Sequence, residues 1–157
     1  MHLETRVGKS QWEWTENDLW HEVRKNSKES LYYFAGAVLH MQDLIPELHE
    51  PFAGFIQLLP WNGGPPESLR KLGWMPRGHY KSSIASIALP LWLLVHDRNT
   101  TIALISSKEK QVQEWLRAIQ DHVRYNTFFQ WAFPEIQVGV KCDEHELLLK
   151  RDSEFIG

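Results

Sequence analysis

The 157-residue sequence has a single cysteine, Cys142, and this scarcity limits the kinds of protein it can be. One thiol cannot form an internal disulfide, so the disulfide-stapled folds of small secreted proteins are excluded. A single thiol also cannot supply the several thiolates of a cysteine-based zinc site. We interpret Cys142 as an inert thiol, because no base lies near it in the sequence.

The sequence also lacks a basic excess and a long apolar run. Its 17 Lys and Arg against 20 Asp and Glu give a net charge of −3, which argues against a stand-alone polyanion-binding domain. The longest apolar run, residues 84–95, is shorter than the roughly 20 apolar residues that span a bilayer. Residues 1–14 lack the apolar core of a secretory signal, and we interpret them as a flexible leader. We therefore expect a soluble protein from a reducing, intracellular environment.

What the sequence does contain is enough apolar material for one folded domain. Hydrophobic residues make up 43% of the chain and aromatic residues 12%, and there are eight Trp. Trp buries a large apolar area, so this composition argues against disorder.

The sequence predicts helices over the first part of the chain, up to residue 59. Thr15 and Asp18 have the spacing of a capping box, which predicts a helix over 16–25 that ends in the polar cluster at 25–28. A second helix is expected over 29–41, and an apolar stripe from Leu48 to Leu59 predicts a third.

After the Pro- and Gly-rich loop at 60–66, strands and helices are expected to alternate. The predicted elements are a strand at 69–75, a helix at 82–96 kinked at Pro90, a strand at 101–105, a helix opened by a capping box of Ser106 and Glu109, and candidate strands at 137–140 and 146–150. This order predicts an α/β fold in which 69–75 and 101–105 are adjacent parallel strands joined by a right-handed crossover.

The segment between the first expected strand and the next helix has the context of a phosphate-binding loop. Such a loop cradles phosphates with backbone N–H groups, while a Lys reaches the β and γ oxygens and the next hydroxyl ligates Mg²⁺. Lys81 and Ser82 occupy those two positions. The usual glycines at the loop's ends are replaced by Met75 and Tyr80, and a plain strand-to-helix turn is the alternative interpretation.

A wider match comes from the whole segment, which resembles the variant Walker A motif of the large terminase subunits of tailed bacteriophages. In that family a Pro-Arg-Gly-His segment, a variable residue and Lys-Ser/Thr replace the Gly-bounded loop. The residues that carry the resemblance are Pro76, Arg77, Gly78, His79, Tyr80, Lys81, Ser82 and Ser83. The flanks 44–51 and 101–117 resemble the family's entry segment and its following βα unit.

The resemblance implies a P-loop ATPase fold and a motor that couples ATP hydrolysis to the translocation of DNA into a capsid. It implies an incomplete parallel sheet flanked by helices, with a helical segment at 1–60 and the first half of the ATPase core at 61–157. Residues 76–83 would bind ATP, with Lys81 and Arg77 as the catalytic residues and Ser82 as the Mg²⁺ ligand. His49 would lie near the adenine, with a packed helix as the alternative.

The implied partners are double-stranded viral DNA, the portal protein and the small terminase subunit, with a homo-oligomeric motor in the host cytoplasm and no membrane association. Neither Asp143-Glu144 nor Asp152 follows a clean apolar strand, so the acidic Walker B residues and the nuclease domain are expected beyond Gly157. We therefore expect weak ATP binding and little turnover from this chain. The alternative is a truncated phage or prophage protein that acts as a non-catalytic interaction module.

Overall fold

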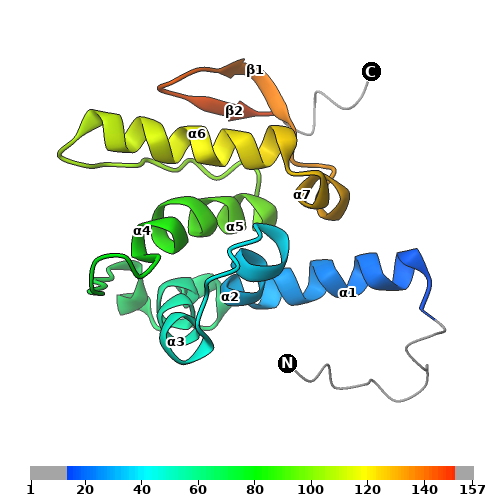
Figure 1. Cartoon of the computed structure of the whole chain (residues 1–157), viewed down its shortest axis with the longest axis horizontal. Coiled ribbons are helices and arrows are strands. Elements are labelled where there is room, and N and C mark those ends of the chain that lie inside the picture. The colour runs from blue at the N-terminus through cyan, green and yellow to red at the C-terminus, as the bar shows by residue number, and fades with distance from the viewer. Residues whose placement is uncertain (1–13, 151–157) are drawn as a thin grey trace.

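A computed structural model describes residues 14–150, so nearly all of the predicted flexible leader lies outside the described residues. The fold is mostly helical, with 58% of the residues in helices (Figure 1). In chain order the elements are α1 (Glu16–Glu29), α2 (Leu31–Tyr33), the π-helical η2 (Phe34–Val38), α3 (Pro46–Gln57), the 3₁₀ turns η3 (Pro60–Asn62) and η4 (Pro66–Leu69), α4 (Lys81–Ser83), the π-helical η5 (Ile84–Ala88), α5 (Leu89–His96), α6 (Glu109–Tyr125), α7 (Thr127–Ala132) and the strands β1 (Val138–Cys142) and β2 (Leu147–Leu149).

The helical stretch from α4 to α5 lies at the centre of the molecule. Figure 1 shows α6 on one side of this stretch, with the β1–β2 hairpin beyond α6, and α2 and α3 on the other side. The segment η5 contacts α6, α3 and η2, and α5 contacts α1. Because α4–α5 and α6 run in the same direction, their N-terminal ends lie at the same side of the molecule (Figure 1).

The start of α1 confirms the predicted capping box. The Asp18 amide donates to Thr15 Oγ1 at 3.2 Å, and the Thr15 amide donates to Asp18 Oδ2 at 2.9 Å. The predicted end at residues 25–28 is wrong, because α1 continues to Glu29. Lysine is a good helix former, and the buried Ser27 packs inside the fold, so this polar cluster does not stop the helix.

The helix predicted over 82–96 is confirmed, with an irregularity near Pro90. The Leu89 amide donates to the carbonyl of Ile84, which gives a π-helical turn immediately before this proline. Pro90 has no N–H to donate to Ser86, and a wide turn is one way in which a helix accommodates such a loss.

The predicted α/β fold with a parallel sheet is wrong. Within residues 14–150 the sheet consists of β1 and β2 alone, and these strands pair antiparallel with Val138 opposite Leu149. Segments 69–75 and 101–105 are not paired as strands. Their apolar patterns favour extended backbone, but a strand also needs a neighbour for its hydrogen-bonding groups, and neither segment has one among the described residues.

The last part of the chain combines confirmed and missed elements. The candidate strands near 137–140 and 146–150 form the hairpin, whereas α7 is a helix that the sequence pattern did not predict. The predicted capping box of Ser106 and Glu109 is wrong, because α6 begins after Lys108 without a side-chain cap. Ser106 Oγ instead donates to Gln111 Oε1 at 3.0 Å.

One hydrophobic core unites the two parts of the chain that meet at residue 60. Phe34 packs edge-on against Phe129 and Phe133, with ring centroids 6.2 and 6.0 Å away. The buried Trp92 donates its indole N–H to the carbonyl of Ser27 at 2.8 Å. Among the described residues, no helix has both the length and the apolar character needed to cross a bilayer.

Candidate functional site

The predicted phosphate-binding segment forms a loop over residues 76–80 that leads directly into α4. Two of its residues have left-handed backbone, Gly78 with φ of 78° and Tyr80 with φ of 50°. A glycine adopts this conformation at little cost, whereas a tyrosine does so only where its surroundings hold it. The loop is therefore shaped as a turn that ends at the N-terminus of the helical stretch from Lys81 to His96.

The backbone amides of residues 78–83 have no hydrogen-bond partner in the part of the chain that the structure describes. The first helical hydrogen bond here runs from the Ile84 amide to the Tyr80 carbonyl at 2.8 Å. Unpaired amides at a helix N-terminus, aided by the helix dipole, attract anions.

The side chains expected to bind phosphate and Mg²⁺ belong to the same segment as these amides. Arg77 is exposed, and Lys81, Ser82 and Ser83 are half-buried in the first helical turn. None of these four side chains forms a hydrogen bond or an ion pair with another residue in the range 14–150. The cations and hydroxyls are therefore available for a ligand.

Tyr80 is fastened to the segment that precedes α3. Its hydroxyl donates to Asp43 Oδ2 at 2.7 Å, and this hydrogen bond, with smaller effects of burial and of the Asp43 charge, raises the pKa of Tyr80. The His79 Nδ1 atom lies 2.9 Å from the Arg77 carbonyl oxygen, so it stays within the loop. The contact between Asp43 and Tyr80 holds the tyrosine in its left-handed conformation.

His49, the residue expected near the adenine, lies next to the same tyrosine. It is 2% exposed, and its ring meets that of Tyr80 edge-on with centroids 5.9 Å apart. His49 Nδ1 accepts the Ile45 amide at 2.7 Å, so in the neutral ring the proton is on Nε2, which has no hydrogen-bond partner among the described residues. The structure thus brings His49 to the loop from a distant part of the sequence.

Sequence reasoning missed Asp43 as part of this site. Asp43 lies in a turn with no motif of its own, and 37 residues separate it from Tyr80. Only the packing of the segment before α3 against the loop brings the two side chains together, so no sequence signal was available.

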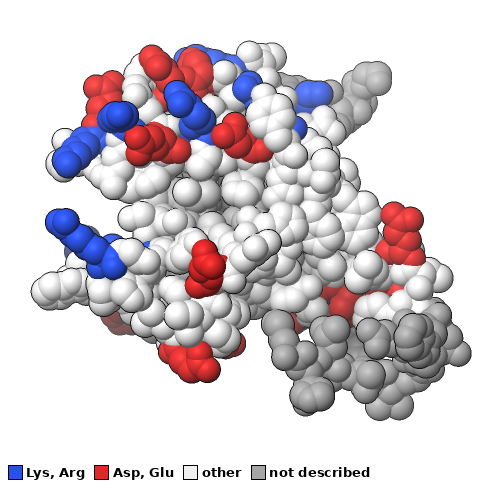
Figure 2. Space-filling model, in the orientation of Figure 1, with Lys and Arg blue, Asp and Glu red and all other residues white. Residues whose placement is uncertain are grey.

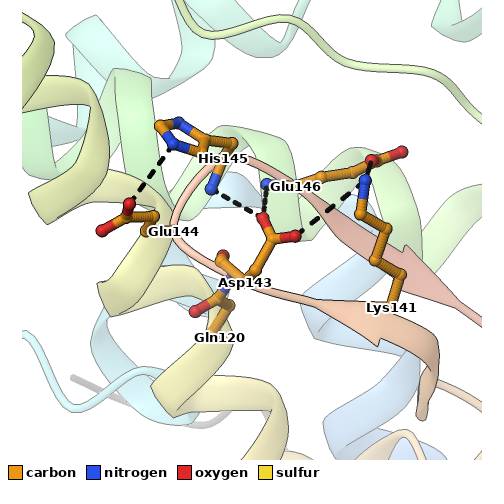
Figure 3. A network of polar contacts seen from close by, with 6 residues as sticks. All are labelled: Gln120, Lys141, Asp143, Glu144, His145 and Glu146. Carbon is orange, nitrogen blue, oxygen red and sulfur yellow. Dashed lines mark hydrogen bonds and ion pairs between the residues drawn. The ribbon is translucent and has the colours of Figure 1, made fainter.

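The acidic pair Asp143-Glu144 is part of the turn between β1 and β2 (Figure 3), apart from the loop at residues 76–80. Asp143 Oδ1 accepts hydrogen bonds from the amides of His145 and Glu146, each at 2.9 Å. The hydrogen bond from His145 is the largest cause of a lowered pKa for Asp143, and the hydrogen bond from Glu146 adds to it, while burial acts in the opposite direction. Lys141 bridges the two strands to Glu146 at 2.5 Å. The two acids therefore belong to a solvent-exposed turn.

The structure contains no ready-made metal centre in the range 14–150, where no group of three or more His, Cys, Asp or Glu side chains is placed to hold a metal ion. Ser82 stays the only Mg²⁺ ligand predicted from the sequence. A bound nucleotide would supply the other oxygens, as is common for Mg²⁺ at phosphate sites.

Comparison of the chain with protein-family models, characterised proteins and solved structures gives no match.

Proposed function

We propose that this chain is the ATP-binding part of a viral DNA-packaging motor, a terminase large subunit, and that the loop at residues 76–83 holds the triphosphate of Mg-ATP. The observation that carries the proposal is the row of unpaired amides at residues 78–83, which leads into a long buried helix. Because the described residues contain no parallel sheet, the proposal rests on this loop, its side chains and the sequence resemblance alone.

Each predicted residue has a role in this proposal. The Lys81 ammonium contacts the β and γ oxygens, the Ser82 hydroxyl ligates Mg²⁺, and the Arg77 guanidinium offsets charge that develops during phosphoryl transfer. The amides of Gly78, His79 and Tyr80 cradle the phosphates. Pro76 and Ser83 bound this anion-binding segment, and His49 lies beside it as the adenine-side contact.

The resemblance to the terminase family supplies the wider setting of this proposal. In that setting the chain works in the host cytoplasm, within a homo-oligomeric motor that contacts double-stranded viral DNA, the portal protein and the small terminase subunit. Asp143 and Glu144 are committed to the hairpin turn, so the acid that orients the attacking water is expected elsewhere. We therefore expect binding of ATP with little hydrolysis by this chain.

Equilibrium binding of ATP to the purified chain, measured by calorimetry, tests the proposal. Lys81→Ala should weaken binding about tenfold or more, because a charge-assisted hydrogen bond contributes about 1.5–3 kcal/mol. Lys25→Ala is a matched control, since it removes an exposed lysine whose partner is Glu29 on α1. Ser82→Ala should weaken binding in the presence of Mg²⁺ and have a smaller effect in its absence.

Two results would contradict the proposal. ATP binding that is unchanged by Lys81→Ala would show that the loop is only a turn. Rapid hydrolysis by the wild-type chain would contradict the expected lack of a catalytic acid, and Asp143 and Glu144 would be the first residues to substitute.

A second candidate function, a non-catalytic interaction module, is favoured by the exposed apolar side chains. Leu72 and Trp74 are each 93% exposed, which is unusual for residues of this size. An absence of ATP binding together with specific protein association would favour this second function.

A further inference from the structure

The loop at residues 76–80 is anchored at both ends by buried side chains, and between them by Tyr80. Met75, before the loop, is 7% exposed, and Ile84, after the first helical turn, is fully buried. Between these anchors the half-buried ring of Tyr80 packs against the hydrophobic core. In the described chain, no non-adjacent atom lies within 4 Å of a Cβ added to Gly78. The path of the loop therefore depends on where the tyrosine is held.

Tyr80 has a backbone conformation that is unfavourable for its residue type. Its φ of 50° is left-handed, and Lys81 directly after it begins the right-handed helix. A change of hand between neighbouring residues turns successive amides toward one concave side, an arrangement that binds anions. The usual phosphate-binding loop has a glycine at this position, and glycine adopts the left-handed conformation freely. A tyrosine needs an interaction that compensates for the steric strain.

Asp43 and His49 supply that interaction from the start of α3 and the segment before it. Asp43 Oδ2 accepts a hydrogen bond from the Tyr80 hydroxyl at 2.7 Å. The His49 ring, which is 2% exposed, stands perpendicular to the Tyr80 ring with centroids 5.9 Å apart. His49 Nδ1 also accepts the Ile45 amide at 2.7 Å, which fixes the backbone two residues after Asp43. His49 thus contacts both the tyrosine ring and the segment that carries the carboxylate.

We propose that Asp43 is a positioning residue of the phosphate-binding loop: its hydrogen bond keeps Tyr80 left-handed and so replaces the glycine that this loop lacks. His49 supports the arrangement by bracing the Tyr80 ring. Asp43 acts on the ligand through the tyrosine, without touching phosphate itself. This inference rests on the proposed phosphate-binding function of residues 76–83.

The negative charge of Asp43 makes the effect of its removal distinctive. Figure 2 shows Lys and Arg side chains at the side of the molecule where α4 and α6 begin, a setting that favours anions. A carboxylate beside such a site repels phosphate, so by charge alone its removal should strengthen binding. Loss of the hydrogen bond to Tyr80 should weaken binding, because the loop then adopts its anion-binding conformation for less of the time. Weaker binding after removal of a negative charge therefore identifies the positioning role.

Calorimetric binding of ATP and of inorganic triphosphate, each with Mg²⁺, to the purified chain tests the proposal. Asp43→Ala and Tyr80→Phe should each weaken binding of both ligands about fivefold or more, and the double variant should bind no more weakly, since both changes remove one hydrogen bond. Asp43→Asn should retain most of the affinity, because its amide oxygen still accepts the hydroxyl. The matched control, Glu47→Ala, removes an exposed carboxylate from the first turn of α3 and should not weaken binding.

The Tyr80→Gly substitution separates positioning from a general loss of structure. In the Asp43→Ala chain it should restore triphosphate binding toward the wild-type level, because glycine is left-handed without help. It should not restore the free energy of unfolding, since it removes a ring that packs against the core. A merely structural role of Asp43 would leave binding impaired in this double variant. If circular dichroism shows that the double variant is unfolded, Tyr80→Asn takes the place of Tyr80→Gly, because asparagine also tolerates this conformation.

The outcomes distinguish this proposal from the proposed function. Wild-type affinity in Asp43→Ala, with binding that is still lost in Lys81→Ala, would overturn this proposal alone. Equal weakening by Asp43→Asn and Asp43→Ala would also overturn it, because the carboxylate would then act through its charge. A chain that binds triphosphate but not ATP would overturn the proposed function, and triphosphate would still test Asp43. A wild-type chain that binds neither ligand would overturn both.

Discussion

At the scale of single residues, Arg24 makes the best-defined polar contact of the fold. Its guanidinium donates to Glu135 Oε1 and Oε2 at 2.7 and 3.0 Å and to the Ala132 carbonyl at 2.6 Å, and it lies 4.5 Å from the centre of the Trp20 ring. Burial raises the pKa of Glu135, but the hydrogen bonds and charge of Arg24 outweigh it and hold that pKa below its usual value. The contact ties α1 to the segment that follows α7.

We predict that Arg24→Met lowers the free energy of unfolding by about 1.5–3 kcal/mol, because it leaves Glu135 without its partner. Arg24→Lys should recover only part of this loss, since an ammonium cannot reproduce the two-pronged contact. The stabilisation is present above the unfolded pKa of glutamate, about 4.3, and is lost as the pH falls below it. Urea unfolding at neutral pH measures the effect.

The control for this prediction is Lys25→Met, which removes an exposed cation 3.7 Å from Glu29 and should change stability by less than about 0.5 kcal/mol. Equal losses for Arg24→Met and Lys25→Met would contradict a special role for the Arg24 contact.

At the scale of elements, the junction of α6 and α7 depends on one side chain, Asn126. Its side-chain oxygen accepts the Phe129 amide at 2.9 Å and so caps α7, while its Nδ2 donates to the Val38 carbonyl at 2.8 Å and lies 3.1 Å from His122 Nδ1. Burial, and then the charge of His40, lower the pKa of His122 against the opposing charge of Asp121. The junction therefore requires a neutral imidazole that accepts a hydrogen bond.

We predict that the junction is acid-sensitive. The unfolded chain binds a proton at His122 near pH 6.5, whereas the folded chain resists it, so stability should fall as the pH drops through that value. His122→Gln should flatten the change in melting temperature between pH 8 and pH 5.5. Thermal unfolding followed by circular dichroism measures it.

His21→Gln on the exposed face of α1 serves as the control and should leave the pH dependence as in the wild type. If His122→Gln left the loss of stability on acidification unaltered, the acid-sensitive group would have to lie elsewhere.

At the scale of the whole molecule, the core crosses the boundary that sequence organisation suggested at residue 60. Leu31, Phe34 and Val38 are fully buried and belong to the same cluster as Trp92 and Phe129. A part of the chain without the first helices would expose the faces of α5 and α7 that these residues cover.

We predict that a fragment of residues 61–157 does not fold cooperatively, because it lacks the apolar partners of α5 and α7. Chemical unfolding of the fragment should show no transition, whereas the full chain shows one. In the full chain, Phe34→Ala should cost about 3–5 kcal/mol. A cooperative transition in the fragment would show that the two parts are separate domains.

Features that depend on neighbouring residues alone could be predicted from the amino-acid sequence. Thr15 and Asp18 are three residues apart and define the start of α1 wherever it packs, and the apolar run before His96 forms a helix despite Pro90. The loop that contains Gly78 and precedes Lys81 could also be predicted, because its backbone conformation and its position before a helix are local properties. These local signals account for most of the helices and for the candidate phosphate-binding residues.

Which distant segments meet depends on the packing of the whole fold. Segments 69–75 and 101–105 have strand-like sequences, but a strand forms only where another strand satisfies its backbone, and no such neighbour is present in the described chain. The contacts of Tyr80 with Asp43 and His49 join positions more than 30 residues apart, which no local pattern encodes. Pairing and burial are properties of the whole fold, and for this reason most helices and the two hairpin strands could be predicted, while the pairing of strands and part of the site could not.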